Sequence, residues 1–438
     1  MEWASVPTAD AAARLLDKAL RSTQSRAMAT SPSASPAEAH ELVIVGGGLV
    51  GLSLGIACAQ AGLDTLVVDR EDPAVMRADS FDGRASAIAY GSQQILSALG
   101  IWPKLAGEAQ PILEIRVADD SAPLFLHYDH REVGDDPLGW IVENTVLRRA
   151  LLARVTELAN LIHAAPQSVA GVERSPAGAL VRFAGGHAIR ARLVAAADGK
   201  ASPLRKTVGI RTIAWSYPQT GIVTTVEHER PHCGVAIEHF LPAGPFAILP
   251  LTGDRSSLVW TERADLAPVI LAMGAADFAD ELRRRFGDFL GAVEPVGPRW
   301  SYPLTFLHAE SYAAERLALV GDAAHVIHPI AGQGLNLGLR DVAALAEVLV
   351  DARRLGLDIG DAEALRRYER WRRMDNWMLA AVTDSLNRLF SNAIPPVKLA
   401  RDVGLAAVNQ IPPLKRLFMR HAMGVVGAQP RLVRGEPL

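Results

Sequence analysis

The sequence predicts an α/β protein in which a Rossmann-like dinucleotide-binding domain carries an inserted domain with a mixed or antiparallel sheet and ends in a helical region. Three observations predict this fold class. A strand, a glycine-rich turn, a helix and a second strand follow one another from residue 41. Residues 215–262 alternate strand patterns with turn residues, as an antiparallel sheet does. From residue 361 onward the pattern is nearly all helical.

The composition of the chain excludes several classes of protein. Its 438 residues are 49% hydrophobic and 21% charged, which is ordinary for globular domains. The net charge of −3 gives no sign of a nucleic-acid partner. Two cysteines, Cys58 and Cys233, exclude a disulfide framework and favour a reducing, cytoplasmic compartment. Residues 365–438 are basic and the remainder is acidic, which predicts either solvated helix faces or a surface that meets an anionic partner.

The first 40 residues are expected to form a flexible extension and linker. Residues 29–39 are a run of Ser, Ala and Pro that cannot build a core. Residues 42–63 lack charged side chains and have the length of a membrane span, but three consecutive glycines, 46–48, would break a spanning helix near its start. We therefore expect a strand, a turn and a helix here, and neither a transmembrane segment nor a signal peptide.

The glycine-rich turn has the spacing of a dinucleotide-binding fingerprint. Gly46, Gly48 and Gly51 lie between an apolar strand and a helix. Gly46 allows the tight turn, Gly48 lets the backbone approach a pyrophosphate, and Gly51 lets the helix pack against the strand. The N–H groups at the helix N-terminus attract the phosphates. Asp69 ends the second strand, where its carboxylate can bind a ribose diol and repel a 2′-phosphate. The sequence therefore predicts binding of FAD or NAD rather than NADP.

Two further apolar strands end in a glycine and an aspartate. Residues 317–320 lead into Gly321 and Asp322, and residues 193–197 lead into Asp198. A carboxylate at the edge of a sheet can hold a sugar hydroxyl. Small residues follow Asp322, so that the backbone can lie against a flat ring, and the dipole of the next helix would stabilise negative charge on a reduced flavin. The residues of this turn and helix start are Gly332, Gln333, Gly334, Leu335 and Asn336.

These three segments together resemble those of the group A flavin monooxygenases, of which para-hydroxybenzoate hydroxylase is the best-known member. The resemblance implies that the bound nucleotide is FAD. Arg84 resembles the arginine that lies along the FAD phosphates in that family, and an ordinary surface ion pair is the alternative. Asn144 and Arg148 match the start of a flavin-contacting helix, where the family often has Gln in place of Asn.

The resemblance narrows to the ubiquinone-biosynthesis hydroxylases of the UbiH/UbiF/VisC type. It is carried by residues 81–85 (FDGRA), 239–242 (HFLP), 244–251 (GPFAILPL) and 412–416 (PPLKR), and it covers about residues 41–438. It implies an enzyme that hydroxylates a polyprenylated phenol with O₂ through a flavin C4a-hydroperoxide. The alternatives are a hydroxylase of a small soluble aromatic compound and an idle FAD protein with a role in assembly.

The chemistry that this resemblance implies needs an apolar pocket, because water would destroy the hydroperoxide. Residues 246–251 are nearly all apolar, and we expect Pro250 at the pocket wall. Pro329 is expected to place its carbonyl near the flavin, and His328 to face the substrate phenol. His325 is expected to be structural and to lie near the flavin phosphates. The two histidines lack a third ligand with useful spacing, so no metal site is predicted.

For the electron donor and for the route of the lipid substrate, the sequence leaves two alternatives each. One glycine fingerprint is present, so we expect no separate nicotinamide domain, and the donor is either NAD(P)H or a reduced ferredoxin. A prenylated substrate implies docking at the inner face of the membrane or association with other ubiquinone-biosynthesis proteins. The C-terminal helices interleave basic and apolar residues, as an interfacial surface does, and basic outer faces of packed helices are the alternative. These residues are Arg366, Arg367, Arg370, Arg372, Arg373, Lys398, Arg401, Lys415, Arg416 and Arg420, with Ile394, Leu399, Leu405, Ile411, Leu414, Leu417 and Phe418.

The expected domain organisation follows from these assignments. The FAD-binding domain comprises residues 41–111, 144–214 and 305–360, the substrate domain comprises residues 112–143 and 215–304, the extension comprises residues 1–40, and the C-terminal helical region comprises residues 361–438.

Overall fold

The computed structural model describes residues 39–78, 82–119, 125–390 and 411–438. The predicted N-terminal extension therefore lies almost wholly outside the described residues. Five residues of the predicted docking surface lie outside them as well: Ile394, Lys398, Leu399, Arg401 and Leu405.

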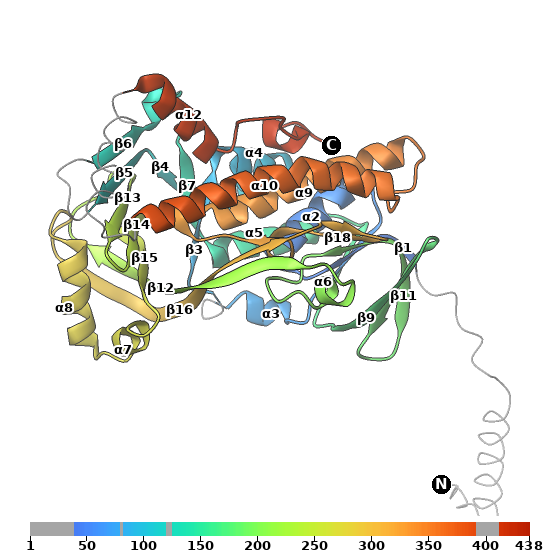
Figure 1. The fold of residues 1–438 in the computed structure, drawn as a ribbon, viewed down its shortest axis with the longest axis horizontal. Helices are drawn as coiled ribbons and strands as arrows, with labels where there is room; N and C mark the ends of the chain where they lie inside the picture. The colour runs from blue at the N-terminus through green and yellow to red at the C-terminus, as the bar shows by residue number, and fades with distance from the viewer. Residues whose placement is uncertain (1–38, 79–81, 120–124, 391–410) are drawn as a thin grey trace, which may run out of the picture. The chain divides into compact units, whose positions relative to one another are not determined.

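The first sheet carries the predicted dinucleotide-binding core (Figure 1). The sheet and its helices comprise β1 (Ala39–Val45), α2 (Leu49–Gln60), β2 (Thr65–Val68), α5 (Asn144–Val155), β8 (Leu161–Ala164), β9 (Val169–Ser175), β10 (Gly178–Phe183), β11 (Ala188–Ala196), β17 (Ala313–Ala314), β18 (Leu317–Leu319) and α9 (Gln333–Arg354). The strand order is β17-β18-β11-β1-β2-β8, and β1, β2 and β8 are parallel. Leu42, Val43 and Ile44 are fully buried, so both faces of β1 are covered.

The second sheet lies beside the first and is mixed. Its elements are β5 (Glu114–Asp119), β6 (Phe125–Asp129), β12 (Thr212–His228), β13 (Val235–Leu241), β14 (Gly244–Leu251), β15 (Arg255–Arg263), α7 (Ala267–Leu271), α8 (Ala275–Phe286), β16 (Val293–Ala309) and β19 (His325–Val326). The order is β19-β16-β12-β15-β14-β13-β5-β6, in which only β13 and β5 pair in parallel. One face packs on α7 and α8 through a core that includes Phe246, Trp260 and Phe278.

A small third sheet connects the other two. It consists of β3 (Ala85–Ala89), β4 (Gln110–Ile112) and β7 (Gly139–Glu143), and α4 (Tyr90–Ala98) follows β3 directly. Ile112 and Ile141 of this sheet share a hydrophobic cluster with Ala236 and Leu251 of the second sheet. The second sheet therefore turns its other face, opposite α7 and α8, toward β3 and β7.

Two helices of the C-terminal region are described, α10 (Ala362–Phe390) and α12 (Pro412–Ala422). Helix α10 runs along α9, and α12 lies near β5 and β6 (Figure 1). Lys415 of α12 is buried and pairs with Glu132 at 2.6 Å, and Met419 packs into the cluster of Ile112. Among the described helices, none combines the length and the apolarity needed to cross a bilayer.

The α/β fold class with an inserted sheet and C-terminal helices is confirmed. The elements differ from expectation mainly at their ends, where sequence patterns are least informative. β1 begins at Ala39, two residues before the predicted start at residue 41, and α9 begins at Gln333, within the segment 332–336 that was predicted to contain the helix start. The segment 112–143, expected to belong to the substrate domain, contributes β5 and β6 to the second sheet.

Candidate functional site

The first glycine turn lies where β1 ends and α2 begins. Gly46 has φ +109°, and a Cβ there would lie 2.2 Å from the carbonyl oxygen of Ala197, just after β11. A Cβ on Gly51 would lie 1.8 Å from the carbonyl oxygen of Gly46. Gly48 differs, because no surrounding atom lies within 4 Å of the place its Cβ would take. The fold itself therefore requires Gly46 and Gly51, whereas Gly48 leaves the backbone open to a ligand.

The Asp69 carboxylate follows β2 and lies beside this turn. Its Oδ2 accepts a hydrogen bond from the Gly47 N–H at 2.5 Å, and its Oδ1 accepts one from the Glu71 N–H at 2.8 Å. Each oxygen keeps a further lone pair with which to bind a sugar hydroxyl. His163 of the neighbouring strand β8 places a buried Nε2 close by, and no described residue bonds to it. Burial lowers the pKa of His163, so its ring is neutral at pH 7.

Asp198 and Asp322 follow β11 and β18, which pair in parallel. Asp198 Oδ2 accepts the Leu204 N–H at 3.1 Å, at the start of α6 (Pro203–Thr207), whereas its Oδ1 is buried without a described partner. The Asp322 side chain is exposed, yet desolvation by the surrounding protein raises its pKa against the opposing effects of His325 and Arg84. The side chain of Asp322 can be reached by solvent, yet the protein around it removes much of its hydration. A carboxylate with both properties lines a cleft rather than the outer surface.

One polar cluster forms where β3 begins and β7 passes into α5. Arg84 binds the Asp82 carboxylate through Nε and Nη2, each at 2.8 Å, and Asn144 donates to it at 2.9 Å. Burial would raise the pKa of Asp82, but these contacts outweigh burial and lower it, so Asp82 is ionised. Arg148 Nη2 lies 3.6 Å from the same carboxylate. The Arg84 guanidinium also lies over the ring of Tyr302, 5.9 Å from its centroid. The structure thus brings Arg84, Asn144 and Arg148 together.

The turn before α9 is fastened to β3. Gly332 has φ +61°, and a Cβ there would lie 2.8 Å from the Cβ of Ala87. Asn336 donates to the Ala87 carbonyl at 2.8 Å and accepts the Ala89 N–H at 2.9 Å. Gly334 is exposed and faces open space. The N-terminus of α9 is therefore fixed in place and accessible. Of the two remaining predicted contacts here, Gln333 is buried and Leu335 is half-buried.

His328 and Pro329 lie between β19 and α9. His328 is buried, and no described residue bonds to its Nε2. Burial lowers the pKa of His328 to about 4, so the imidazole is neutral at pH 7. The ring of Tyr217 meets it edge-on at 5.1 Å between centroids, and the Tyr217 hydroxyl donates to Asp384 of α10 at 2.7 Å. The Pro329 carbonyl, expected near a flavin, accepts the Gly332 N–H at 2.9 Å.

Pro250 lies on the other face of the second sheet from the cleft that holds the remaining predicted site residues. Side chains of β14 alternate between the two faces of the second sheet, so Pro250 shares a face with Phe246 and Ile248. Phe246 and Ile248 pack against α7 and α8. Leu249 and Leu251 occupy the other face, with the third sheet. The structure therefore does not bring Pro250 to the other predicted site residues.

The family of the chain follows from a comparison with known proteins. A family model described as the FAD binding domain matches residues 39–381. The chain belongs to this family. It is 54% identical over 414 residues to the ubiquinone hydroxylase UbiL of Rhodospirillum rubrum. The aligned residues are 94% of the chain and 96% of that protein. It is 37% identical over 387 residues to the 3-demethoxyubiquinol 3-hydroxylase of Escherichia coli, and the aligned residues are 88% of the chain and 98% of that protein.

Solved structures confirm the fold of this FAD-binding chain. The p-nitrophenol 4-monooxygenase PnpA from Pseudomonas putida superposes with a TM-score of 0.73 over 90% of the chain and 100% of that structure. Only 19% of the residues are identical, so this likeness establishes the architecture alone.

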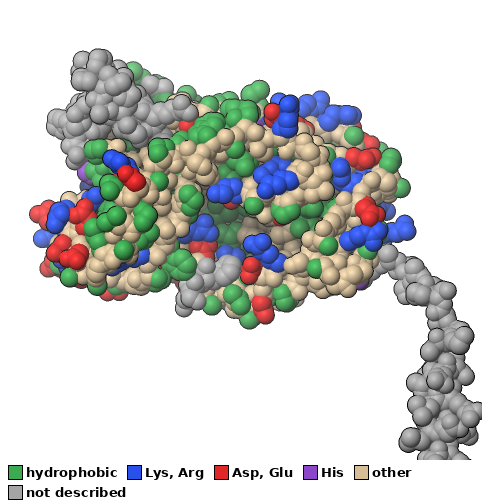
Figure 2. All heavy atoms as spheres, turned by 60° about the horizontal axis from the view of Figure 1, so that its bottom comes forward, with side chains coloured by type: hydrophobic (Ala, Val, Ile, Leu, Met, Phe, Trp, Pro, Cys, Tyr) green, Lys and Arg blue, Asp and Glu red, His purple; other side chains and the backbone are tan. Residues whose placement is uncertain are grey.

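The residues present fit FAD. Gly48 and Gly334 leave open backbone at two helix N-termini, where phosphate and ring oxygens are favoured. The unpartnered Oδ1 of Asp198 and Nε2 of His163 offer further buried hydrogen-bonding atoms. Figure 2 shows a hollow near the middle of one face of the molecule, with hydrophobic side chains in it and Lys and Arg around it.

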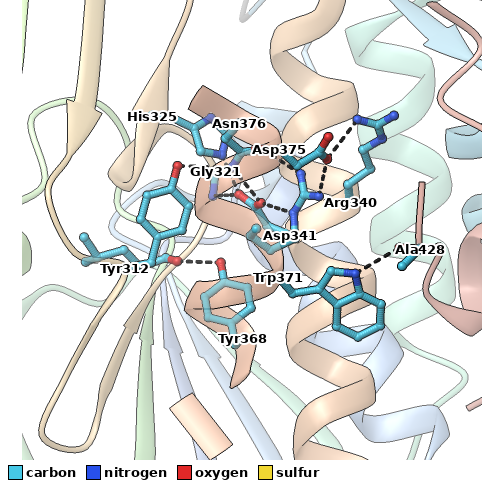
Figure 3. A network of polar contacts seen from close by, with 12 residues as sticks. Tyr312, Gly321, His325, Arg340, Asp341, Tyr368, Trp371, Asp375, Asn376 and Ala428 are labelled. Carbon is cyan, nitrogen blue, oxygen red and sulfur yellow. Dashed lines mark hydrogen bonds and ion pairs between the residues drawn. The ribbon is translucent and has the colours of Figure 1, made fainter. Parts of the chain in front are cut away.

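A buried polar network holds the Gly321 turn of this flavoprotein to α9 and α10 (Figure 3). Asp341 of α9 is fully buried and accepts hydrogen bonds from the Gly321 N–H at 3.1 Å and from His325 Nε2 at 2.5 Å. Arg372 and Asn376 of α10 donate to its other oxygen at 2.9 and 3.2 Å. Burial opposes ionisation, but His325 and Arg372 outweigh it and lower the pKa of Asp341 to about 2. His325 thus has a structural contact with Asp341, and its place near the flavin phosphates stays a prediction.

The sequence did not predict two residues of the site, His163 beside Asp69 and Asp341 in the buried network. His163 is the third residue of an apolar strand, and only the pairing of β8 with β2 brings it beside Asp69. Asp341 stands in an amphipathic helix pattern in which an aspartate normally marks the solvent face. The one available signal was that Asp341 stands directly beside apolar residues that are buried in the structure, among them Leu339, Val342 and Ala343.

Proposed function

We propose that the chain is an FAD-dependent monooxygenase that hydroxylates the ring of a prenylated phenol in ubiquinone biosynthesis. The observation that carries this proposal is its 54% identity, over nearly the whole of both chains, with a ubiquinone hydroxylase. Bound FAD, once reduced, supplies the activated oxygen from O₂. The protein binds the cofactor, orients the ring and keeps water from the reaction.

The roles of the site residues are part of this proposal. Gly46, Gly48 and Gly51 seat the pyrophosphate, and Asp69 binds the adenosine ribose. Asp198 and Asp322 bind further hydroxyls of the cofactor. The accessible N-terminus of α9 at Gly332, Gln333 and Gly334 stabilises the negative charge of the reduced ring. Arg84, Asn144 and Arg148, which share contacts with Asp82 at the start of β3, hold the cofactor there.

His328 and Pro329 are proposed to contact the substrate. A neutral imidazole with a free, buried Nε2 can donate or accept one hydrogen bond to a phenol without bringing charge into an apolar cleft. The Pro329 carbonyl keeps a second lone pair beyond its bond with Gly332. Pro250 lies on the face covered by α7 and α8, which gives no support to its predicted place at the pocket wall.

The test of the proposed function is mass spectrometry of quinone-pathway lipids in a strain that lacks this gene. We expect a prenylated phenol short of one hydroxyl to accumulate and ubiquinone to fall, and expression of the chain should restore both. Unchanged lipids in a strain with no second hydroxylase of this family would contradict the proposal and favour a small soluble aromatic substrate. Single turnovers with NADH, NADPH and reduced ferredoxin will separate the candidate electron donors.

We also propose that α12 brings the protein to the inner face of an anionic membrane. Its outer face carries Arg416 and Arg420 beside the exposed apolar side chains Leu417 and Phe418. Lys415, which belongs to the predicted basic surface, is buried against Glu132 and takes no part.

Charge reversal tests this docking. Arg416→Glu with Arg420→Glu should weaken co-sedimentation with phosphatidylglycerol vesicles at least about tenfold, since each basic residue near an anionic surface contributes about 1 kcal/mol. Arg182→Glu with Arg190→Glu, on the exposed hairpin of β10 and β11, is the control and should bind as the wild type does. Equal binding by both double variants would remove the membrane proposal, and co-purification with other ubiquinone-biosynthesis proteins would then be measured.

A further inference from the structure

A row of side chains crosses the second sheet on one face. The register pairs Glu238 with Ala247, Ala247 with Val259, Val259 with Val223, and Val223 with Trp300. Residues directly opposite one another in a sheet share a face. A Cβ on Gly83 would lie 2.0 Å from Nε1 of Trp300, so the row begins against the loop of Arg84. It passes through Glu238 and continues to Val117 of β5 and Leu126 of β6.

This face is turned toward the proposed place of the flavin ring. Leu249, two residues beyond Ala247 on the same face of β14, shares a hydrophobic cluster with Ala87 of β3. Ala87 in turn contacts the turn at Gly332 before α9. Glu238 therefore lies on the wall of the cleft opposite the turn that is proposed to hold the flavin.

Glu238 is the one charged side chain in this row, and its surroundings are unusual for a carboxylate. It is half-buried, and no described residue donates a hydrogen bond to it. Desolvation alone raises its pKa to about 7. A carboxylate in such surroundings costs free energy unless it is paired. Like Asp322, it is both accessible and desolvated, which is the property of a side chain that lines a cleft.

Glu227 of β12 also lies on this face, opposite Arg255 in the register, but it is exposed at the end of the sheet. Two ion pairs hold other charged groups at this face. Arg255 of β15 binds Glu143 of β7 at 3.3 Å, and Lys415 of α12 binds Glu132 at 2.6 Å. Three tyrosines from α4, β6 and β16 also face this space, and burial raises the pKa of each: Tyr90, Tyr128 and Tyr302. These phenols are neutral at pH 7, so Glu238 is the group of this wall that changes charge near that pH.

We propose that Glu238 is a catalytic residue that binds the ring hydroxyl of the phenol substrate and accepts its proton. In this step the phenol O–H bond breaks, an O–H bond forms on the carboxylate, and no electron is transferred. The proton returns to solvent when the product leaves. The small side chains of Ala247 and Val259 provide an apolar floor for the ring. This inference rests on the proposed function and adds to it the identity of the base.

The chemistry agrees with the position. An ionised phenol is more electron-rich than a neutral one and attacks an electrophilic oxygen more readily. A base whose pKa lies near the working pH is the most effective kind, and positioned bases contribute about 100-fold to 10⁴-fold in rate.

The experiment compares Glu238→Gln with the wild type as full-length, FAD-loaded proteins. The flavin is reduced with dithionite, mixed with oxygenated buffer and a short-chain prenylated phenol, and the hydroxylated product of one turnover is measured between about pH 6 and pH 8. The wild-type rate should rise with pH through about 7, since the base must be ionised. The variant should be at least about 100-fold slower at pH 8, without the rise, and with unchanged flavin content.

Two further variants make the result decisive. Glu227→Gln removes an exposed carboxylate from β12 of the same sheet and should behave as the wild type. Glu238→Asp keeps the carboxylate and should keep the rise with pH. A flavin-loaded Glu238→Gln protein with the wild-type rate and pH profile would overturn the inference, as would loss of flavin from both Glu238 variants. Wild-type protein that turns over without hydroxylating the phenol would instead overturn the proposed function.

Discussion

Asp341→Ala is expected to lower the free energy of unfolding by about 3–5 kcal/mol, because removing one partner of a buried ion pair leaves the other charge uncompensated. Arg372 is only 3% exposed and would lose its buried counter-charge. The Gly321 N–H and His325 would lose their acceptor as well. Since Gly321 begins the turn that carries Asp322, most of the bound FAD should also be lost. Urea denaturation and the visible flavin absorbance of the purified protein measure the two effects.

Asp375→Ala is the matched control. Asp375 also pairs with Arg372, at 2.6 Å, but its side chain is 41% exposed. Because the Asp375 carboxylate is reached by water and Arg372 keeps its buried partner Asp341, this variant should lose less stability than Asp341→Ala and should keep its flavin. If the two variants had equal stability and flavin content, the buried network would not stabilise the flavin turn.

Acid denaturation gives an independent check on Asp341. Folding lowers the pKa of this carboxyl from its ordinary value of 3.8 to about 2. A group whose pKa is lowered by folding stabilises the protein fully above its unfolded pKa, and this stabilisation is lost as the pH falls through the folded pKa. The wild type should therefore lose this contribution between about pH 4 and pH 2, and Asp341→Ala should show a correspondingly shallower dependence of stability on pH in that window.

Gly51→Ala is expected to abolish FAD binding and to destabilise the protein by about 3 kcal/mol or more, since its Cβ would lie 1.8 Å from the carbonyl oxygen of Gly46. Helix α2 would have to move away from β1, and the phosphate-facing N–H groups would move with it. Gly48→Ala is expected to behave differently. Its backbone has φ −69° and open space around it, so the fold should tolerate a methyl group there.

The comparison of these two glycines separates folding from ligand binding. Gly48→Ala should have the wild-type midpoint of unfolding without FAD, but a weaker affinity for FAD, because the methyl group occupies space that the pyrophosphate needs. Differential scanning fluorimetry of the flavin-free proteins and titration with FAD give both quantities. Wild-type FAD affinity in Gly48→Ala would show that the pyrophosphate lies elsewhere.

The sequence predicted the structure best at positions where sterics or strand direction admit only one residue type or one placement. Gly46 at φ +109° and Gly51 beneath a carbonyl could be predicted because no other residue fits those positions. Asp198 and Asp322 could be predicted to share one edge, because carboxyl ends of parallel strands meet there. In each case a local pattern determines the three-dimensional position.

The rest depends on tertiary pairing that a local pattern does not contain. Pro250 and Leu249 are adjacent and both apolar, and only the packing of α7 and α8 decides which one faces the cleft. Glu238 could be recognised only after the register placed it in one row with Trp300. Asp341 looks like an ordinary helix residue until α10 supplies Arg372.

The contacts of Asn336 have a consequence for how the protein is made. Its side chain joins α9 to β3 across 247 residues of sequence, and the sheet that contains β1 is completed only when residues 317–319 pair with β11. Pairings so distant in the chain form slowly, because loop-closure entropy must be overcome first. We therefore expect the sheet to stay incomplete during synthesis until residues 317–319 have left the ribosome. We expect flavin to be captured after translation by a nearly complete chain, and the unfinished sheet to depend on chaperones until then.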